Sequence, residues 1–218
     1  MARIGLLGGC FNPVHNAHLR LALEVQEQLG LDSIECIPSA VPPHKPGQGM
    51  LDFDRRVEFL EAATASLPQV SVNTLEANRP GPSYTIDTLC RLRETRPDDS
   101  FWFILGACDL LMVPLWKRGL EIVNYANLAV ANRVDDTLDG VIRFMGRTWP
   151  EAQRDGASTW RFLDGHQLDF VEIPRLDISS SQVRERWISQ RSVYGLVPEC
   201  IDSLLEQYEH EVATVWKA

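Results

Sequence analysis

The sequence lacks the features of a membrane protein, a secreted protein or a non-specific nucleic-acid-binding protein. No apolar run is long enough to span a bilayer, and the few apolar residues before Cys10 are too few for a signal peptide. The formal charge of −9 and the pI near 5.0 exclude the dominant positive field that nucleic acids or anionic membranes require. We therefore expect no nucleic-acid and no membrane partner, and any anionic substrate must meet a local basic cluster.

The cysteine pattern is sparse and argues against an extracellular scaffold. The five cysteines are an odd number, and no two of them have C-x-x-C spacing. A reducing compartment suits this pattern better than a disulfide framework does, so we expect a cytoplasmic protein. No repeat or low-complexity linker divides the 218 residues, of which 44% are hydrophobic, and we expect a single domain over 1–218.

What the sequence does contain is a glycine turn between a strand pattern and a helix pattern. The apolar run that ends at Leu7 is followed by Gly8 and Gly9, and a helical pattern begins near His18. A helix N-terminus presents unpaired amides and the positive end of the helix dipole, and both favour a phosphate. Glycines let the backbone approach that phosphate closely. This turn is therefore a candidate phosphate site.

Two histidines share this location. His15 and His18 are three residues apart, so on the first turn of a helix they project from nearly the same face. Imidazoles can donate hydrogen bonds to phosphate oxygens and offset charge that builds up during nucleotidyl transfer. Two alternatives stay open: an ordinary helix start with two partly exposed histidines, and a zinc site, for which no third His or Cys at ligand spacing is nearby.

A second strand and a cationic loop follow the first helix. The helix pattern ends near Gly30, and residues 33–38 predict a short buried strand, which completes a βαβ unit. Such units place ligands at the carboxyl ends of their strands. At that position the Pro- and Gly-rich segment 41–49 predicts a loop that carries His44 and Lys45, with a solvated surface loop as the alternative.

The remaining patterns predict an α/β fold of the Rossmann-like, doubly wound type, with a mostly parallel sheet flanked by helices. Further strands are predicted over 70–75, 101–105, 128–131 and 168–173. Further helices are predicted over 54–66, from 83 through 92, and over 198–210. On the helix over 54–66 we expect Arg55 and Arg56 to lie on the solvated face. Residues 136–165 predict only surface helices and turns.

A second helix start is predicted near the C-terminus, in the segment Ile178-Ser179-Ser180-Ser181-Gln182-Val183-Arg184. Ser179 and Gln182 have the spacing of a capping box, which leaves hydroxyls and amides pointing outward at a helix N-terminus. Arg184 lies on the first turn of that helix, so the segment is a second candidate anion site. The alternative is a well-capped helix without a ligand.

Both segments resemble signatures of one enzyme superfamily. Residues 9–18 match the nucleotidyltransferase signature G-x-F-[DN]-P-x-H-x-G-H except at Ala17, where the signature has glycine. Residues 178–184 resemble the I-S-S-[TS]-x-[IV]-R element of the same superfamily. Between them, Pro-Pro-His-Lys at 42–45, Ser-Tyr-Thr at 83–85 and Trp116 resemble, in order, elements of the bacterial nicotinate-mononucleotide adenylyltransferases.

The resemblance implies a reaction: transfer of the adenylyl group of ATP to nicotinate mononucleotide, giving deamido-NAD and pyrophosphate in NAD biosynthesis. For ATP, it implies contacts from Gly8, Gly9, Phe11, His15, His18, Ser179, Ser180 and Arg184. For the mononucleotide, it implies contacts from His44, Lys45, Ser83, Tyr84, Thr85, Trp116 and Arg133. The catalytic residues that it implies are His15, His18, Lys45 and Arg184.

Several alternatives remain at this point. Ser83 also fits a simple helix N-cap, and Trp116 also fits a core position. A related transferase that uses nicotinamide mononucleotide or phosphopantetheine would keep both terminal motifs, and so would a non-catalytic adenine-nucleotide-binding protein. We expect Mg²⁺ to arrive with ATP, because no dedicated carboxylate cage is visible and no residue is assigned as a metal ligand. A homo-oligomer is compatible with the sequence.

Overall fold

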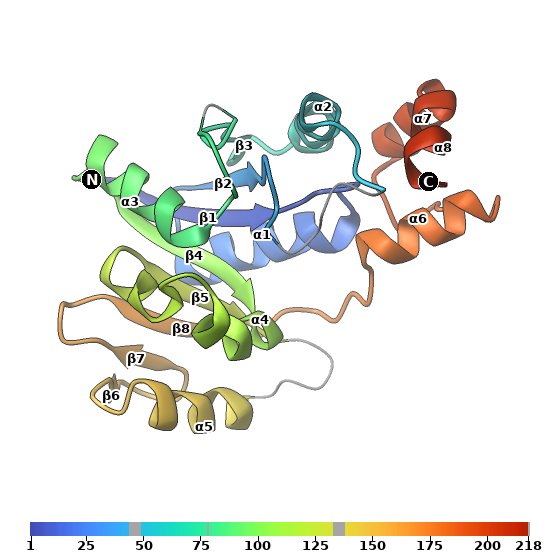
Figure 1. The fold of residues 1–218 in the computed structure, drawn as a ribbon. Coiled ribbons are helices and arrows are strands. Elements are labelled where there is room, and N and C mark those ends of the chain that lie inside the picture. The colour runs from blue at the N-terminus through green and yellow to red at the C-terminus, as the bar shows by residue number, and fades with distance from the viewer. Residues whose placement is uncertain (44–48, 78, 133–137, 218) are drawn as a thin grey trace. The chain divides into compact units, whose positions relative to one another are not determined.

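The structure is a computed structural model of the chain, and it describes all residues except 44–48, 78, 133–137 and 218. Its strands form one eight-stranded sheet in the order β3-β2-β1-β4-β5-β8-β7-β6 (Figure 1). The predicted α/β class, with a mostly parallel sheet and flanking helices, is confirmed. Contacts group the chain into two compact units, which are described separately; the expectation of a single domain stays a prediction.

Unit 1 comprises residues 1–8, 21–34 and 84–175 and contains most of the sheet. Four of its strands run parallel: β1 (Arg3–Gly9), β4 (Ser100–Gly106), β5 (Asn127–Ala131) and β8 (Gln167–Val171). Two short strands, β7 (Thr159–Arg161) and β6 (Gln153–Arg154), continue beyond β8 in antiparallel pairing. The central position predicted for 101–105 is confirmed, since β4 lies between β1 and β5.

The core of unit 1 is mostly apolar along the strands, and it includes the buried carboxylate of Asp169. All five residues of β5 are buried, as expected for a strand covered on both faces. Asp169 on β8 is 6% exposed and accepts hydrogen bonds from the Trp102 indole, the Thr159 hydroxyl and the Gln167 amide. A buried carboxylate needs such donors to offset the loss of its hydration.

The helices of unit 1 connect these strands. Those that belong to unit 1 are α3 (Thr85–Thr95), α4 (Ala107–Met112), the 3₁₀ helices η1 (Val113–Leu115) and η2 (Gly119–Asn124), and α5 (Leu138–Thr148). Helix α1 (Asn16–Leu29) has its first residues in unit 2 and the rest in unit 1. It ends before Gly30, which has a φ of 59°, a conformation that glycine adopts without strain.

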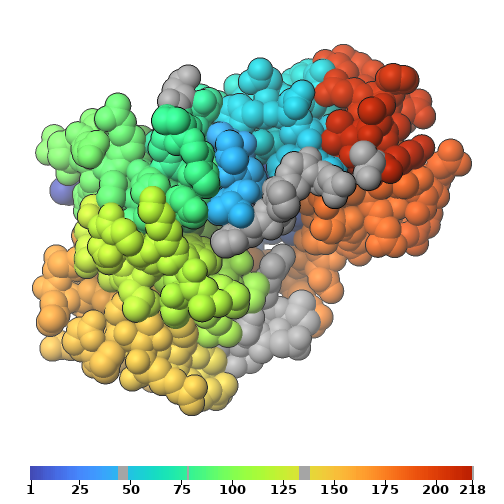
Figure 2. Space-filling view, viewed as in Figure 1, coloured from blue at the N-terminus to red at the C-terminus, as the bar shows by residue number. Residues whose placement is uncertain are grey.

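Unit 2 comprises residues 9–20, 35–83 and 176–218, and it is mostly helical. Its elements are most of β2 (Ser33–Pro38), α2 (Phe53–Thr64), β3 (Val70–Val72), α6 (Ser180–Ile188), α7 (Glu199–Gln207) and α8 (Glu209–Trp216). Helix α7 packs on α2 and on α8, and Figure 2 shows the red surface of the last two helices beside the cyan surface of α2. Arg55 on α2 forms an ion pair with Glu211 on α8.

Three predicted elements differ from the structure. The helix predicted over 198–210 is two helices, because Tyr208, with φ −104° and ψ 25°, breaks the helical path between α7 and α8. The segment 136–165, predicted as helices and turns alone, also contains β6 and β7. Pairing of β7 with β8, and of β6 with β7, makes strands of weakly patterned residues. The strand predicted over 70–75 stops at Val72. Among the described residues, no helix is both long and apolar enough to cross a bilayer.

Gly119 provides a test of the packing in unit 1. A Cβ atom there would lie 1.9 Å from the backbone oxygen of Val113 and 3.0 Å from Cβ of Trp116. Gly119→Ala should therefore lower the free energy of unfolding by about 1–3 kcal/mol, the usual cost of overpacking. Gly140→Ala is the matched control, because its Cβ would meet nothing within 4 Å; alanine should there stabilise α5 by up to about 1 kcal/mol. Urea unfolding of both variants measures the difference, and equal stabilities would contradict the described packing.

Candidate active site

The turn after β1 is buried and tightly built. Phe11 has a φ of 46°, the Asn12–Pro13 peptide bond is cis, and both Phe11 and Asn12 are almost fully buried. A Cβ atom on Gly9 would lie 3.3 Å from the Phe11 ring, so a side chain there would displace this ring. The glycine and the phenylalanine of the predicted motif therefore depend on each other. Gly8, by contrast, is exposed, and an added Cβ would make only ordinary contacts.

The two histidines of the turn face each other. The rings of His15 and His18 are stacked, with centroids 3.6 Å apart and planes 19° from parallel, and Phe11 contacts His18 edge-on. The backbone N–H of His15 donates to Nδ1 of His18, at 3.3 Å. Because Nδ1 accepts this bond, the ring proton of neutral His18 sits on Nε2. His15 is 4% exposed, and His18 is the more accessible of the pair.

The second predicted helix start has the expected cap. Ser179 is the N-cap of α6, and its hydroxyl accepts a hydrogen bond from the backbone N–H of Gln182 at 3.2 Å. This is the serine half of the predicted capping box. The adjacent hydroxyl, that of Ser180, donates to the backbone oxygen of Pro13 at 2.8 Å. Ser180 therefore attaches α6 to the first turn, and its proton is already engaged in this structure.

Arg184 makes the second contact between the two motifs. Its Nη1 donates to the backbone oxygen of Asn12 at 2.8 Å, and its Nη2 donates to the hydroxyl of Ser181 at 3.2 Å. Burial of the guanidinium lowers the pKa of Arg184, yet an arginine stays cationic at neutral pH. The two motifs lie at opposite ends of the sequence, and within unit 2 they form one cluster with imidazole, hydroxyl and guanidinium donors. Such a donor set suits the oxygens of a polyphosphate.

Sequence reasoning missed a second arginine beside the first turn. Arg56 was expected on the solvated face of its helix, and that expectation is wrong: the residue is 1% exposed. Its Nε donates to the oxygen of Leu51 at 2.9 Å, and its Nη1 donates to the oxygen of Cys10 at 2.8 Å. The side chain of Asn12 joins the same segment, donating to the oxygen of Gly49 at 2.7 Å and accepting from the N–H of Leu51 at 3.2 Å.

A periodicity signal for Arg56 did exist. The buried residues of α2 include Phe59, Leu60 and Ala63, and Arg56 precedes Phe59 and Leu60 by three and four residues, on the same helix face. The positive charge of Arg56 favoured a solvent-exposed position. Its burial is tolerable because backbone carbonyls of other segments accept hydrogen bonds from its guanidinium. Its neighbour Arg55 forms an ion pair with Glu211, and its guanidinium lies 3.4 Å from the centre of the Tyr208 ring.

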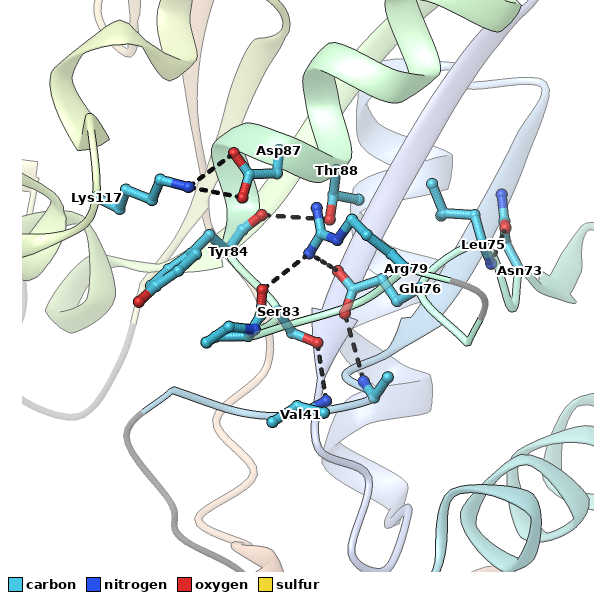
Figure 3. A network of polar contacts seen from close by, with 12 residues as sticks. Val41, Asn73, Leu75, Glu76, Arg79, Ser83, Tyr84, Asp87, Thr88 and Lys117 are labelled. Atoms are coloured by element: carbon cyan, nitrogen blue, oxygen red, sulfur yellow. Dashed lines mark hydrogen bonds and ion pairs between the residues drawn. The ribbon is translucent and has the colours of Figure 1, made fainter.

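Ser83 does not cap helix α3. The N-cap of α3 is Tyr84, so the alternative of Ser83 as the N-cap is wrong. Ser83 instead pairs with Val41 in unit 2: its hydroxyl accepts from the Val41 N–H at 3.0 Å, and its own N–H donates to the Val41 oxygen at 2.8 Å (Figure 3). The neighbouring Ala40 N–H donates to the buried carboxylate of Glu76 at 3.4 Å. The chain after β2 is thus held by the segment that leads to Ser83.

The start of α3 and the segment around Trp116 lie together in unit 1. The ammonium of Lys117 lies 4.6 Å from the centre of the Tyr84 ring and pairs with Asp87 at 2.9 Å (Figure 3). Trp116 is partly exposed and meets Phe103 edge-on, with ring centroids 6.4 Å apart, so it is not a fully buried core residue. Thr85 is the first residue of α3, so the Tyr84 ring and the Lys117–Asp87 pair lie at a helix start.

Three of the predicted site residues lie outside the described part of the chain: His44, Lys45 and Arg133. Their proposed roles rest on the sequence alone. Within the described residues, no group of three or more His, Cys, Asp or Glu side chains could hold a metal ion.

Residues 6–186 match the model of a family described as cytidylyltransferase-like, a span that contains both motifs. The chain belongs to the cytidylyltransferase-like family. A Trichlorobacter lovleyi protein of that kind, "Probable nicotinate-nucleotide adenylyltransferase", is 41% identical over 210 residues, covering 94% of this chain and 97% of the relative. A Bacillus pumilus protein of the same name is 35% identical over 208 residues, covering 95% and 97%.

Solved structures agree with this family in fold. Nicotinic acid mononucleotide adenylyltransferase from Plasmodium falciparum complexed with APC aligns over 97% of this chain and 98% of that one, with a TM-score of 0.75 and 16% identity. The same enzyme complexed with NaAD aligns with a TM-score of 0.75 and 18% identity. At this identity the likeness concerns the fold. The resemblance that the motifs indicated, to the bacterial nicotinate-mononucleotide adenylyltransferases, is confirmed by the family model and the relatives.

Ser179 allows the cap and the anion site to be tested separately. Ser179→Ala removes the cap and should cost about 1 kcal/mol of unfolding free energy, whereas Ser179→Thr should keep most of it. Ser179→Asp keeps a capping side chain but adds a negative charge at the proposed phosphate site, so KM for ATP should rise while stability is retained. Chemical denaturation and steady-state kinetics separate the two effects. A Ser179→Ala protein as stable as the wild type would show that the cap is unimportant.

Proposed function

We propose that the protein transfers the adenylyl group of ATP to nicotinate mononucleotide and forms deamido-NAD and pyrophosphate, a step of NAD biosynthesis. The observation that carries this proposal is the convergence of the two motifs in unit 2, where Arg184 and Ser180 bind the backbone of the turn that holds His15 and His18. The names of the relatives support the choice of acceptor.

In the proposed reaction, a phosphate oxygen of the mononucleotide attacks the α-phosphorus of ATP in line. A new oxygen–phosphorus bond forms, the bond between the α-phosphorus and the bridging oxygen breaks, and pyrophosphate leaves with that oxygen. No side chain acts as a nucleophile, so the protein contributes positioning and charge stabilisation. His18 would donate from Nε2 to the reacting phosphate region, and Arg184 would stabilise the negative charge of the leaving pyrophosphate.

The other predicted ATP contacts fall into three groups. Gly9 and Phe11 would act indirectly, since the Phe11 ring is buried against His18 and does not itself face solvent. Ser179 and the first amides of α6 would contact the terminal phosphates, with Ser180 holding α6 in place through Pro13. Gly8, predicted in the turn, is an exposed residue near the end of β1 and would allow close approach of the nucleotide.

Mg²⁺ would be held by the phosphates of ATP rather than by the protein. The described donors are imidazole, hydroxyl and guanidinium groups, which suit phosphate oxygens, whereas Mg²⁺ prefers carboxylate and water oxygens. When bound with ATP, the ion would neutralise part of the triphosphate charge. His15, His18 and Arg184 would then bind and orient the metal-loaded triphosphate.

The acceptor site is proposed around the start of α3 in unit 1. Tyr84, Thr85 and Trp116 would contact the pyridine ring and its carboxylate, because a flat indole can stack on the ring and helix amides can bind the carboxylate. Ser83 would contribute chiefly by its pairing with Val41. His44, Lys45 and Arg133 remain proposals for the phosphate groups, and a cytoplasmic location and a homo-oligomer remain predictions.

A pyrophosphate-release assay tests the function. Purified protein with ATP and Mg²⁺ is given nicotinate mononucleotide, nicotinamide mononucleotide or phosphopantetheine in turn. We expect the highest kcat/KM with nicotinate mononucleotide. A higher value with another acceptor would identify a related transferase, and ATP binding without pyrophosphate release from any acceptor would identify a nucleotide-binding protein.

His18 is the residue whose loss should affect the chemistry most directly. His18→Ala should lower kcat by about 100–1,000-fold, the usual effect of losing one donor to developing charge. KM for ATP should change much less, because the donor acts mainly in the transition state. His210→Ala on α8 serves as the control and should retain wild-type kinetics. A His18→Ala enzyme with nearly full turnover would remove that histidine from the mechanism.

A further inference from the structure

Arg56 is a buried cation that the proposed mechanism does not use. Its side chain is 1% exposed, and burial lowers its pKa from the ordinary arginine value. Removing a guanidinium from water is costly unless its N–H groups find partners. The partners here are two backbone carbonyls, of Leu51 and Cys10. An apolar residue would fill this position on α2 at lower cost if packing were the only requirement.

The two carbonyls belong to segments on either side of the first turn. Cys10 opens the turn, and Leu51 lies two residues before the start of α2. Arg56 binds both through Nε and Nη1 of one planar group, so it fixes the distance between the two segments. A lysine ammonium, a single point at the end of a flexible stem, cannot hold both carbonyls in the same geometry.

Asn12 also connects the first turn with the segment before α2, and it is the residue that contacts Arg184. Its side chain binds Gly49 and Leu51, and its own backbone oxygen accepts the hydrogen bond from Arg184. A continuous series of hydrogen bonds therefore runs from Arg56 through Leu51 and Asn12 to Arg184. Each member is either a backbone group or a side chain that is at least half-buried.

We propose that Arg56 is a positioning residue for adenylyl transfer, which sets the backbone of Cys10–Asn12 so that Arg184 and the histidine pair are aligned on the triphosphate. The inference rests on the proposed function, because it concerns the same site. Arg56 touches no substrate in this account. It acts through Asn12, and its loss disturbs the placement of the donors rather than removing one.

The test compares adjacent arginines on one helix. Arg56→Lys and Arg56→Met are measured beside Arg55→Met, whose wild-type residue forms an ion pair with Glu211 away from the turn. Thermal unfolding gives stability, and kcat with both KM values is measured well below each unfolding midpoint. Arg56→Lys should lose about 10–100-fold in kcat, because misplacement by about 1 Å costs that much. KM for the mononucleotide should stay near the wild-type value. Arg55→Met should lower the midpoint and keep kcat.

The possible outcomes distinguish failure of the proposed role of Arg56 from failure of the proposed function. An inactive wild type refutes the proposed function. With an active wild type, three results overturn the role of Arg56: wild-type kcat in Arg56→Lys, an equal loss of kcat in Arg55→Met, or failure of both Arg56 variants to fold even in the cold, which would make the residue structural.

A double-mutant cycle with Asn12 tests the shared path. If Arg56 acts through Asn12, the loss of kcat in the Arg56→Lys, Asn12→Ala double variant should be smaller than the product of the two single losses, since residues in one network are not additive. Losses that multiply would show that the two residues act independently, and would contradict the proposed series of contacts.

Discussion

The structure of this site depends on hydrogen bonds from side chains to the backbone oxygens of one short turn. Arg184 binds Asn12 across 172 residues of sequence, and Ser180 binds Pro13 across 167. Backbone carbonyls are fixed in space once the turn is formed, so these bonds place the start of α6 against the first turn. This attachment brings the two motifs, which lie far apart in the sequence, into one cluster of side chains within unit 2.

The first turn is a packed structure and not an open glycine loop. Phe11 is buried and orients His18, the His15 N–H holds Nδ1 of His18, and Gly9 makes room for the phenylalanine ring. The His18 ring is thus held in place by its packing and by a backbone hydrogen bond. The residues of the first motif therefore depend on one another in their packing.

Two positive side chains of unit 2, those of Arg56 and Arg184, contact the backbone of the same turn. The chain carries a formal charge of −9, but unit 2 concentrates guanidinium and imidazole groups around the turn. Arg56 is buried and Arg184 is partly buried, and burial lowers the pKa of each. Backbone oxygens supply their hydrogen-bond partners at the turn. A cation held by neutral carbonyls keeps its charge available to attract an anion, whereas one paired with a carboxylate is largely neutralised.

The sequence by itself determined the class of fold, the strands 33–38 and 101–105, the capped start of α6 and the identity of both motifs, because these depend on local periodicity and spacing. Only the tertiary structure decided that Arg56 is buried, that Ser83 pairs with Val41 instead of capping α3, and that β6 and β7 form. Those features depend on partners supplied by distant segments. The carbonyl groups that make the burial of a charge tolerable lie elsewhere in the sequence, and so does the strand that pairs with a weakly patterned strand. Neither partner can be identified from the residues next to the one that it stabilises.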